Sequence, residues 1–141
     1  MKNQISLIVV EDDLDEQQLL KEALEASGHF SVIYMASHRN ELMKQLGSNI
    51  PDAILCAYHL PAQNGVEILK ELKASDTYAA ISFVLVDNGY DESYKSEASK
   101  LDPAGFLARP VSIDGYQNFE NNLYEILKPL KEDVPIDEIK G

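Results

Sequence analysis

The sequence contains a single cysteine, Cys56, so no disulfide can form within the chain. This fits a protein of the reducing cytoplasm better than a secreted protein that depends on disulfides. Cys56 stands inside an apolar run. We therefore interpret it as a small buried hydrophobic residue and not as a nucleophile.

Basic side chains are also scarce, because 12 lysines and arginines stand against 24 aspartates and glutamates, giving a net charge of −12. Nucleic acids and anionic membranes attract proteins through basic patches, so this balance argues against both as partners. Long apolar runs are missing from the start of the chain, where Ile5–Val10 is too short for a signal peptide or membrane span. We expect a soluble cytoplasmic protein.

What the sequence does contain is a regular alternation of short apolar runs and helical patterns. The apolar runs predict strands at Ile5–Val10, Ser31–Ala36, Ala53–Ala57, Ile81–Val86 and Phe106–Ala108. Apolar residues at three- and four-residue steps predict helices at Leu14–Ser27, after Ser37, from about Asn64, at Asp91–Leu101, and after Ser112, the last with Ile113 and Leu130 among its recurring apolar residues.

This alternation predicts an α/β fold, a doubly wound parallel sheet with helices on both faces. The length of 141 residues suits one domain, which buries roughly 70% of its unfolded surface. We expect this domain to cover residues 1–130, followed by a mobile tail at 131–141 and no output domain. The pattern alone does not give the order of the strands.

Chemically active side chains follow most of the predicted strands. They are Glu11, Asp12 and Asp13 after the first strand, Asp87 and Asn88 after the fourth, and Arg109 and Pro110 after the fifth. The third strand ends instead in Ala57, which offers no reactive group. The carboxyl ends of such strands converge at the edge where ligands bind. Carboxylates crowded there raise one another's pKa unless a cation neutralises them.

From about residue 4 to residue 130, the chain resembles a receiver domain of bacterial two-component response regulators. The resemblance is carried by the acidic cluster after the first strand, the Asp52–Leu55 segment, Pro61, the Asn64–Gly65 pair and the Arg109–Pro110 pair. It implies a flavodoxin-like (βα)5 fold with five parallel strands in the order 2-1-3-4-5. It also implies a cis Arg109–Pro110 peptide bond, although cis is the minority state of such bonds.

The chain departs from this family at the positions that carry phosphotransfer. Ala57 replaces the phosphoacceptor aspartate, Asp87 the switch serine or threonine, and Arg109 the lysine. A methyl group cannot accept a phosphoryl group, so the resemblance implies a degenerate pocket in which Asn88 and Pro110 also take part. The aromatic switch position of the family falls on Phe106, which we expect to be fixed in the core.

The same changes affect the metal that receivers bind. The family holds Mg²⁺ with an acid pair, here Glu11 and Asp12, the phosphoacceptor and a backbone carbonyl, in near-octahedral oxygen geometry. Without an aspartate at position 57, we expect no cofactor, or Mg²⁺ bound only weakly. We expect Arg109 to pair with Asp12 or Asp87 and neutralise the pocket. The alternative is that these side chains drifted and face solvent.

Tyrosines gather around the fourth and fifth predicted helices, which form the usual output and dimer face of the family. Since aromatic residues are enriched at interfaces, this predicts an interaction face made by Tyr90, Tyr94 and Tyr116, which would suit a homodimer through the fourth helix, fifth strand and fifth helix. The histidines lack metal-ligand spacing and are interpreted as surface residues: His29, His38 and His59.

We interpret the chain as a stand-alone pseudo-receiver and not an enzyme. It would act by phosphorylation-independent interaction with other signalling proteins, such as a histidine kinase or a response regulator. Two alternatives stay open. One is a phosphotransfer receiver with another acceptor, Asp13, Asp52 or Asp87. The other is a metal-dependent phosphatase, suggested by Asp13 and Asp15, although the flanking pattern fits poorly.

Overall fold

The computed structural model describes residues 4–89 and 92–131. Within these ranges, five parallel strands form one sheet in the order β2-β1-β3-β4-β5, as the resemblance implies. The strands are β1 (Ile5–Val10), β2 (Phe30–Ala36), β3 (Ala53–Ala57), β4 (Ser82–Asp87) and β5 (Gly105–Ala108). Tyr90 and residues 132–141, which include nearly all of the expected tail, lie outside the described residues.

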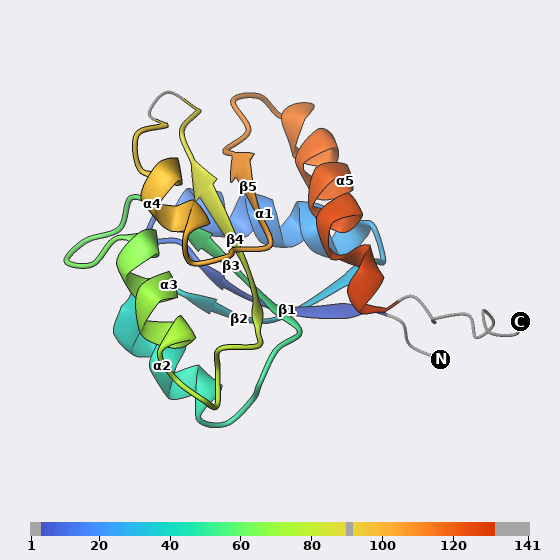
Figure 1. The fold of residues 1–141 in the computed structure, drawn as a ribbon. Helices are drawn as coiled ribbons and strands as arrows, with labels where there is room; N and C mark the ends of the chain where they lie inside the picture. Colours follow the sequence, from blue (N-terminus) through green and yellow to red (C-terminus); the bar gives the residue numbers. More distant parts are fainter. Residues whose placement is uncertain (1–3, 90–91, 132–141) are drawn as a thin grey trace, which may run out of the picture.

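Helices cover both faces of the sheet (Figure 1). They are α1 (Leu14–Ala26), α2 (Arg39–Leu46), α3 (Gly65–Lys73), α4 (Lys95–Ser99) and α5 (Gly115–Leu127), the last followed by a 3-10 turn at Lys128–Leu130. One core lies under α1 and α5, and the other lies under α2, α3 and α4. The predicted flavodoxin-like architecture is therefore confirmed.

The central strand β3 is buried on both faces, which explains its uninterrupted apolar sequence. Ile54 and Cys56 pack into the core under α2, α3 and α4, whereas Ala53 and Leu55 pack into the core under α1 and α5. Successive side chains of a strand point to opposite faces, so a central strand supplies both cores in turn. Burial raises the pKa of the Cys56 thiol, in agreement with a structural cysteine.

The start of α3 is fixed against the end of β3. Asn64 Oδ1 accepts a hydrogen bond from the Glu67 amide, and Glu67 Oε1 accepts one from the Asn64 amide, both at 2.9 Å. This reciprocal pair forms a capping box. Gly65 follows, and a Cβ atom there would lie 2.7 Å from the carbonyl oxygen of Ala57. Only glycine allows the helix to approach the strand tip so closely.

The ends of the last predicted helix differ from the structure. α5 begins at Gly115, so Ile113 lies in the loop before it and is exposed. Leu130 lies in the 3-10 turn and is also exposed. The prediction that both belong to the last α-helix was wrong, because the apolar spacing continues beyond the two ends of that helix. The described residues contain no helix with the length and apolar character of a membrane span.

Candidate functional site

Strand pairing brings the ends of β1, β3, β4 and β5 to one edge of the sheet. Val10 pairs with Cys56, Ala57 with Val86, and Asp87 with Ala108. The Arg109 amide donates to the carbonyl oxygen of Asp87 at 2.7 Å. Because neighbouring strands carry them, Glu11, Ala57, Asp87 and Arg109 belong to a single site.

Glu11 is the acid that binds the arginine. Its Oε1 accepts a hydrogen bond from Arg109 Nη2 at 2.6 Å, and its Oε2 accepts one from the Asp13 amide at 3.0 Å. The Glu11 side chain is only 3% exposed and that of Arg109 is 30% exposed. Burial raises the pKa of Glu11, while the Asp13 amide and the Arg109 charge act in the opposite direction.

The predicted salt bridge therefore exists, but its predicted partners, Asp12 and Asp87, were wrong. Asp12 is exposed to solvent, and the Asp87 carboxylate is bound elsewhere. Glu11 directly follows β1 and is buried, whereas Asp12 lies in the bend that comes next and is exposed. Glu11, and not Asp12, points to the arginine.

A second acid, Glu16 of α1, extends this network. Its Oε2 lies 3.9 Å from Arg109 Nε, and neither atom has a hydrogen-bond partner among the described residues. Its Oε1 accepts a hydrogen bond from the Tyr116 hydroxyl at 2.8 Å. Sequence reasoning missed Glu16, because an acid in the first turn of a helix is ordinarily explained by the helix dipole. Burial, followed by the Glu16 contact, raises the pKa of Tyr116.

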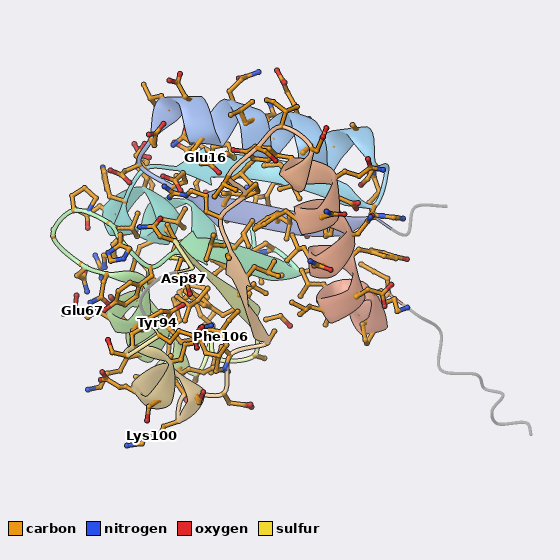
Figure 2. The ribbon with its side chains drawn as sticks, turned by 90° about the horizontal axis from the view of Figure 1, so that it is seen from above. Glu16, Glu67, Asp87, Tyr94, Lys100 and Phe106 are labelled. Carbon is orange, nitrogen blue, oxygen red and sulfur yellow. The ribbon has the colours of Figure 1, made fainter. Side chains whose placement is uncertain are left out.

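Asp87 is held by groups on the other side of the site. Its Oδ1 accepts a hydrogen bond from the Gly89 amide at 2.6 Å, and its Oδ2 accepts one from the Tyr94 hydroxyl. Figure 2 shows Tyr94 beside Asp87 and Phe106. Tyr94 is only 6% exposed. Its assignment to an exposed interaction face was therefore wrong, because its ring and hydroxyl are turned into the protein.

The remaining predicted residues are less engaged with the strand tips. Asn88 is exposed, and Pro110 is half-buried. Phe106 packs against the core and is half-buried, with Lys95 Nζ 5.4 Å from its ring centre. The described residues contain no cis peptide bond, so the expected cis Arg109–Pro110 bond was wrong and this bond keeps the trans form that most X–Pro bonds prefer.

The residues at this edge do not fit Mg²⁺. Ala57 contributes no side-chain oxygen, Glu11 is bound by Arg109 and the Asp13 amide, and both Asp87 oxygens accept hydrogen bonds. Within the described ranges, no three or more histidine, cysteine, aspartate or glutamate side chains are grouped to hold a metal ion. Mg²⁺ needs several oxygen ligands in octahedral arrangement, and this set does not offer them.

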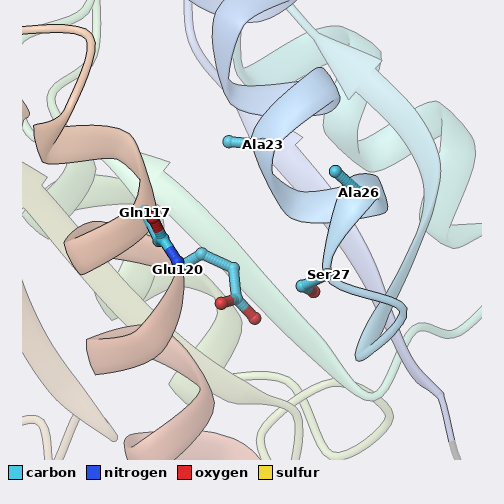
Figure 3. Close-up of a pocket in the computed structure, with 5 residues that line it drawn as sticks. All are labelled: Ala23, Ala26, Ser27, Gln117 and Glu120. Carbon is cyan, nitrogen blue, oxygen red and sulfur yellow. The ribbon is translucent and has the colours of Figure 1, made fainter.

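Away from the strand tips, a shallow hollow lies between α1 and α5 (Figure 3). It is lined by Ala23, Ala26, Ser27, Gln117 and Glu120. Glu120 is buried, and its Oε2 lies 2.7 Å from Nδ1 of His29, whose ring stacks on Tyr124. His29 is therefore half-buried in a structural contact, whereas His38 and His59 are exposed as expected.

Known proteins resemble this chain in sequence and in fold. The transcriptional regulatory protein MalR of Bacillus subtilis is 25% identical over 80% of this chain and 47% of its own length. The phosphorylated cyanobacterial phytochrome response regulator RcpA has a TM-score of 0.78 at 21% identity, covering 89% of this chain and 94% of RcpA. The chemotaxis response regulator CheY4 of Vibrio cholerae has a TM-score of 0.73 at 17% identity, covering 88% and 99%.

The chain spans less than half the length of the curated relatives that lead this comparison. At these identities, the solved structures establish a shared fold. The response regulator receiver domain family matches residues 7–118. This stretch is most of the chain and includes every strand tip described above, so the chain belongs to the response regulator receiver domain family of two-component signalling.

Proposed function

We propose that this chain is a receiver that acts without phosphorylation, through binding to other signalling proteins. The observation that carries the proposal is the buried methyl group of Ala57 at the strand tip, where a phosphoacceptor would need a carboxylate. The neighbouring acids support it, because Arg109 binds Glu11 and Tyr94 binds Asp87. Protein groups thus occupy the carboxylate oxygens of Glu11 and Asp87, the two buried acids at the strand tips.

The candidate alternative acceptors are poorly placed. Asp13 caps α1, with its Oδ1 accepting from the Glu16 amide at 3.0 Å. Asp52 precedes β3 at the opposite edge of the sheet, where its Oδ2 accepts from the Ser6 amide at 2.9 Å and lies 3.3 Å from Lys131 Nζ. These contacts favour a receiver without an acceptor over a receiver with a displaced one.

Exposed apolar side chains at the start of α1 and in the loop before α5 support binding to a protein. Leu14, Val111 and Ile113 are 72%, 91% and 75% exposed. A hollow between α1 and the loop before α5 is lined by Leu19, Pro110, Val111, Ser112, Ile113 and Tyr116. Exposed acids neighbour these apolar residues in the sequence: Asp12, Asp13 and Asp15 around Leu14, and Asp114 after Ile113. The occupant of the hollow would be a partner helix that carries lysine or arginine beside apolar residues, because such a helix matches both the apolar side chains and their acidic neighbours.

The homodimer through α4, β5 and α5 stays a proposal, and the structure supports it less than binding beside α1. Tyr94 is buried, and the Tyr116 hydroxyl is turned toward Glu16. Neither tyrosine is free to contribute its polar group to a second copy of the chain. The more exposed apolar side chains lie at the start of α1 and in the loop before α5.

Intact-mass spectrometry after incubation with Mg²⁺ and a small phosphodonor tests the proposal. We expect an unchanged mass, with fast acquisition at mildly acidic pH because acyl phosphates are labile. A receiver with the usual aspartate, treated in parallel, must gain one phosphoryl group. A stoichiometric adduct on this chain would overturn the proposal, and peptide mapping would then identify the acceptor.

A further inference from the structure

Helix α4 is short and weakly anchored by its own apolar side chains. It covers only Lys95–Ser99, and within it only Ala98 is buried. The residue just before it, Tyr94, is far larger and also buried. The Ala98 amide donates to the carbonyl oxygen of Tyr94 at 3.0 Å, so the first turn of the helix begins on this tyrosine. What fixes Tyr94 therefore fixes α4.

Tyr94 is held at its ring and at its hydroxyl. The ring stacks on Tyr58 of the loop after β3, with centres 4.1 Å apart and planes 18° from parallel. The ring also makes an edge-to-face contact with Phe106 of β5, with ring centres 6.0 Å apart. The hydroxyl donates to Asp87 Oδ2 at the end of β4 (Figure 2). The contacts of one side chain thus join α4 to the tips of β3 and β4 and to β5.

We propose that the Tyr94–Asp87 hydrogen bond is an internal latch that holds α4 in one position against the sheet without any phosphoryl group. A hydrogen bond to a carboxylate is stronger than one between neutral groups, and a buried hydroxyl left without a partner is costly. Asp87 is itself fixed, because its Oδ1 accepts from the Gly89 amide. The latch thereby sets which surface α4 and β5 present to a partner.

Hydrogen–deuterium exchange of Tyr94→Phe tests the latch, because this change removes the hydroxyl and keeps the ring. We expect the amides of Ala98, Lys100 and Leu101, which are hydrogen-bonded within and after α4, to exchange about tenfold faster or more, relative to the amides of β1. Tyr78→Phe is the matched control, since Tyr78 lies in the loop between α3 and β4. It should leave α4 unchanged.

A double-mutant cycle separates a latch from a general loss of packing. Asp87→Ala alone should speed exchange in α4, and adding Tyr94→Phe to it should have little further effect, because both changes break the same hydrogen bond. Additive effects would overturn the proposal. So would exchange in α4 that matches the Tyr78→Phe control, rises only in step with β1, or is unprotected in the unaltered chain.

The latch adds a conformational element to the proposed function, yet its test uses no phosphodonor. Failure of the exchange experiment would leave α4 held by ring packing alone and would not create a phosphoacceptor. A phosphoryl adduct in the mass measurement would refute the proposed function and leave the Tyr94–Asp87 contact in place. The latch and the proposed function can therefore be refuted separately.

Discussion

Replacing Arg109 with alanine is expected to lower the free energy of unfolding by about 2–3 kcal/mol at neutral pH. Removing one partner of a buried ion pair leaves an uncompensated charge, which costs about 3–5 kcal/mol when both partners are fully buried. The value is reduced here because the Arg109 side chain is 30% exposed and solvent screens part of the interaction. Equilibrium urea denaturation measures the change.

Arg39→Ala is the control, since the Arg39–Glu71 pair is about one third exposed on both sides. Such a pair contributes about 0.2–1 kcal/mol, so the two arginines should differ clearly. Adding Glu11→Gln to the Arg109→Ala variant should restore stability, because the unpaired charge is then gone. Equal losses at the two arginines, or no rescue by glutamine, would contradict the assignment of Arg109 as the internal cation of the pocket.

The stability loss caused by Arg109→Ala should depend on pH in a defined direction. Burial raises the pKa of Glu11 in the folded chain, so the folded state binds the proton more tightly than the unfolded state. The stability from this group is therefore present at low pH and is lost as pH rises through the folded pKa. Removing Arg109 takes away one influence that lowers that pKa. The deficit of Arg109→Ala should thus be larger at about pH 8 than at about pH 5.

Restoring an aspartate at position 57 is expected to destabilise the chain by about 3 kcal/mol or more in the absence of divalent metal. The new carboxylate would be buried beside Glu11 and Asp87, and Arg109 is already bound to Glu11. A buried charge without a partner is costly. Millimolar Mg²⁺ should recover part of the loss, because it supplies a cation to crowded carboxylates. Thermal melting with and without Mg²⁺ measures both effects.

Ala57→Asn is the matched control, since the asparagine side chain has nearly the same shape as that of aspartate and carries no charge. It should cost less than Ala57→Asp, and Mg²⁺ should not change its melting temperature. If Ala57→Asp melted like the unaltered chain without metal, a free cation would have to be present at the strand tip. That result would contradict the account in which Arg109 is already paired with Glu11 and leaves no cation for a carboxylate at position 57.

Sequence patterns predict the architecture well because burial imposes them. β3 reads as an apolar run since both of its faces are covered, and the family resemblance supplied the strand order, which no pattern contains. To predict that the strand tip lacks a carboxylate, it is enough to know that β3 ends at Ala57. The composition of the pocket was therefore predictable, with Glu11, Asp87 and Arg109 at neighbouring strand ends.

The pairing inside the pocket was not predictable in the same way. Whether Glu11 or Asp12 meets Arg109 depends on which of two successive residues points inward once the strand has ended. Tyr94 belongs to the weak helical pattern at Asp91–Leu101, which gives it an inward direction, but the pattern does not show that its hydroxyl meets Asp87, seven residues away in sequence. Such contacts follow from loop geometry and not from periodicity.

The most direct test of the central claim is a ¹H–¹⁵N correlation spectrum recorded during titration with Mg²⁺ and then with a small phosphodonor. The amides of Asp13, Tyr58, Gly89 and Arg109 surround the strand tips and report on any ligand there. A closed, acceptor-free pocket predicts that they shift no more than in a sodium chloride control of matched ionic strength. Saturable shifts confined to these amides, or a new set of resonances with the phosphodonor, would contradict it.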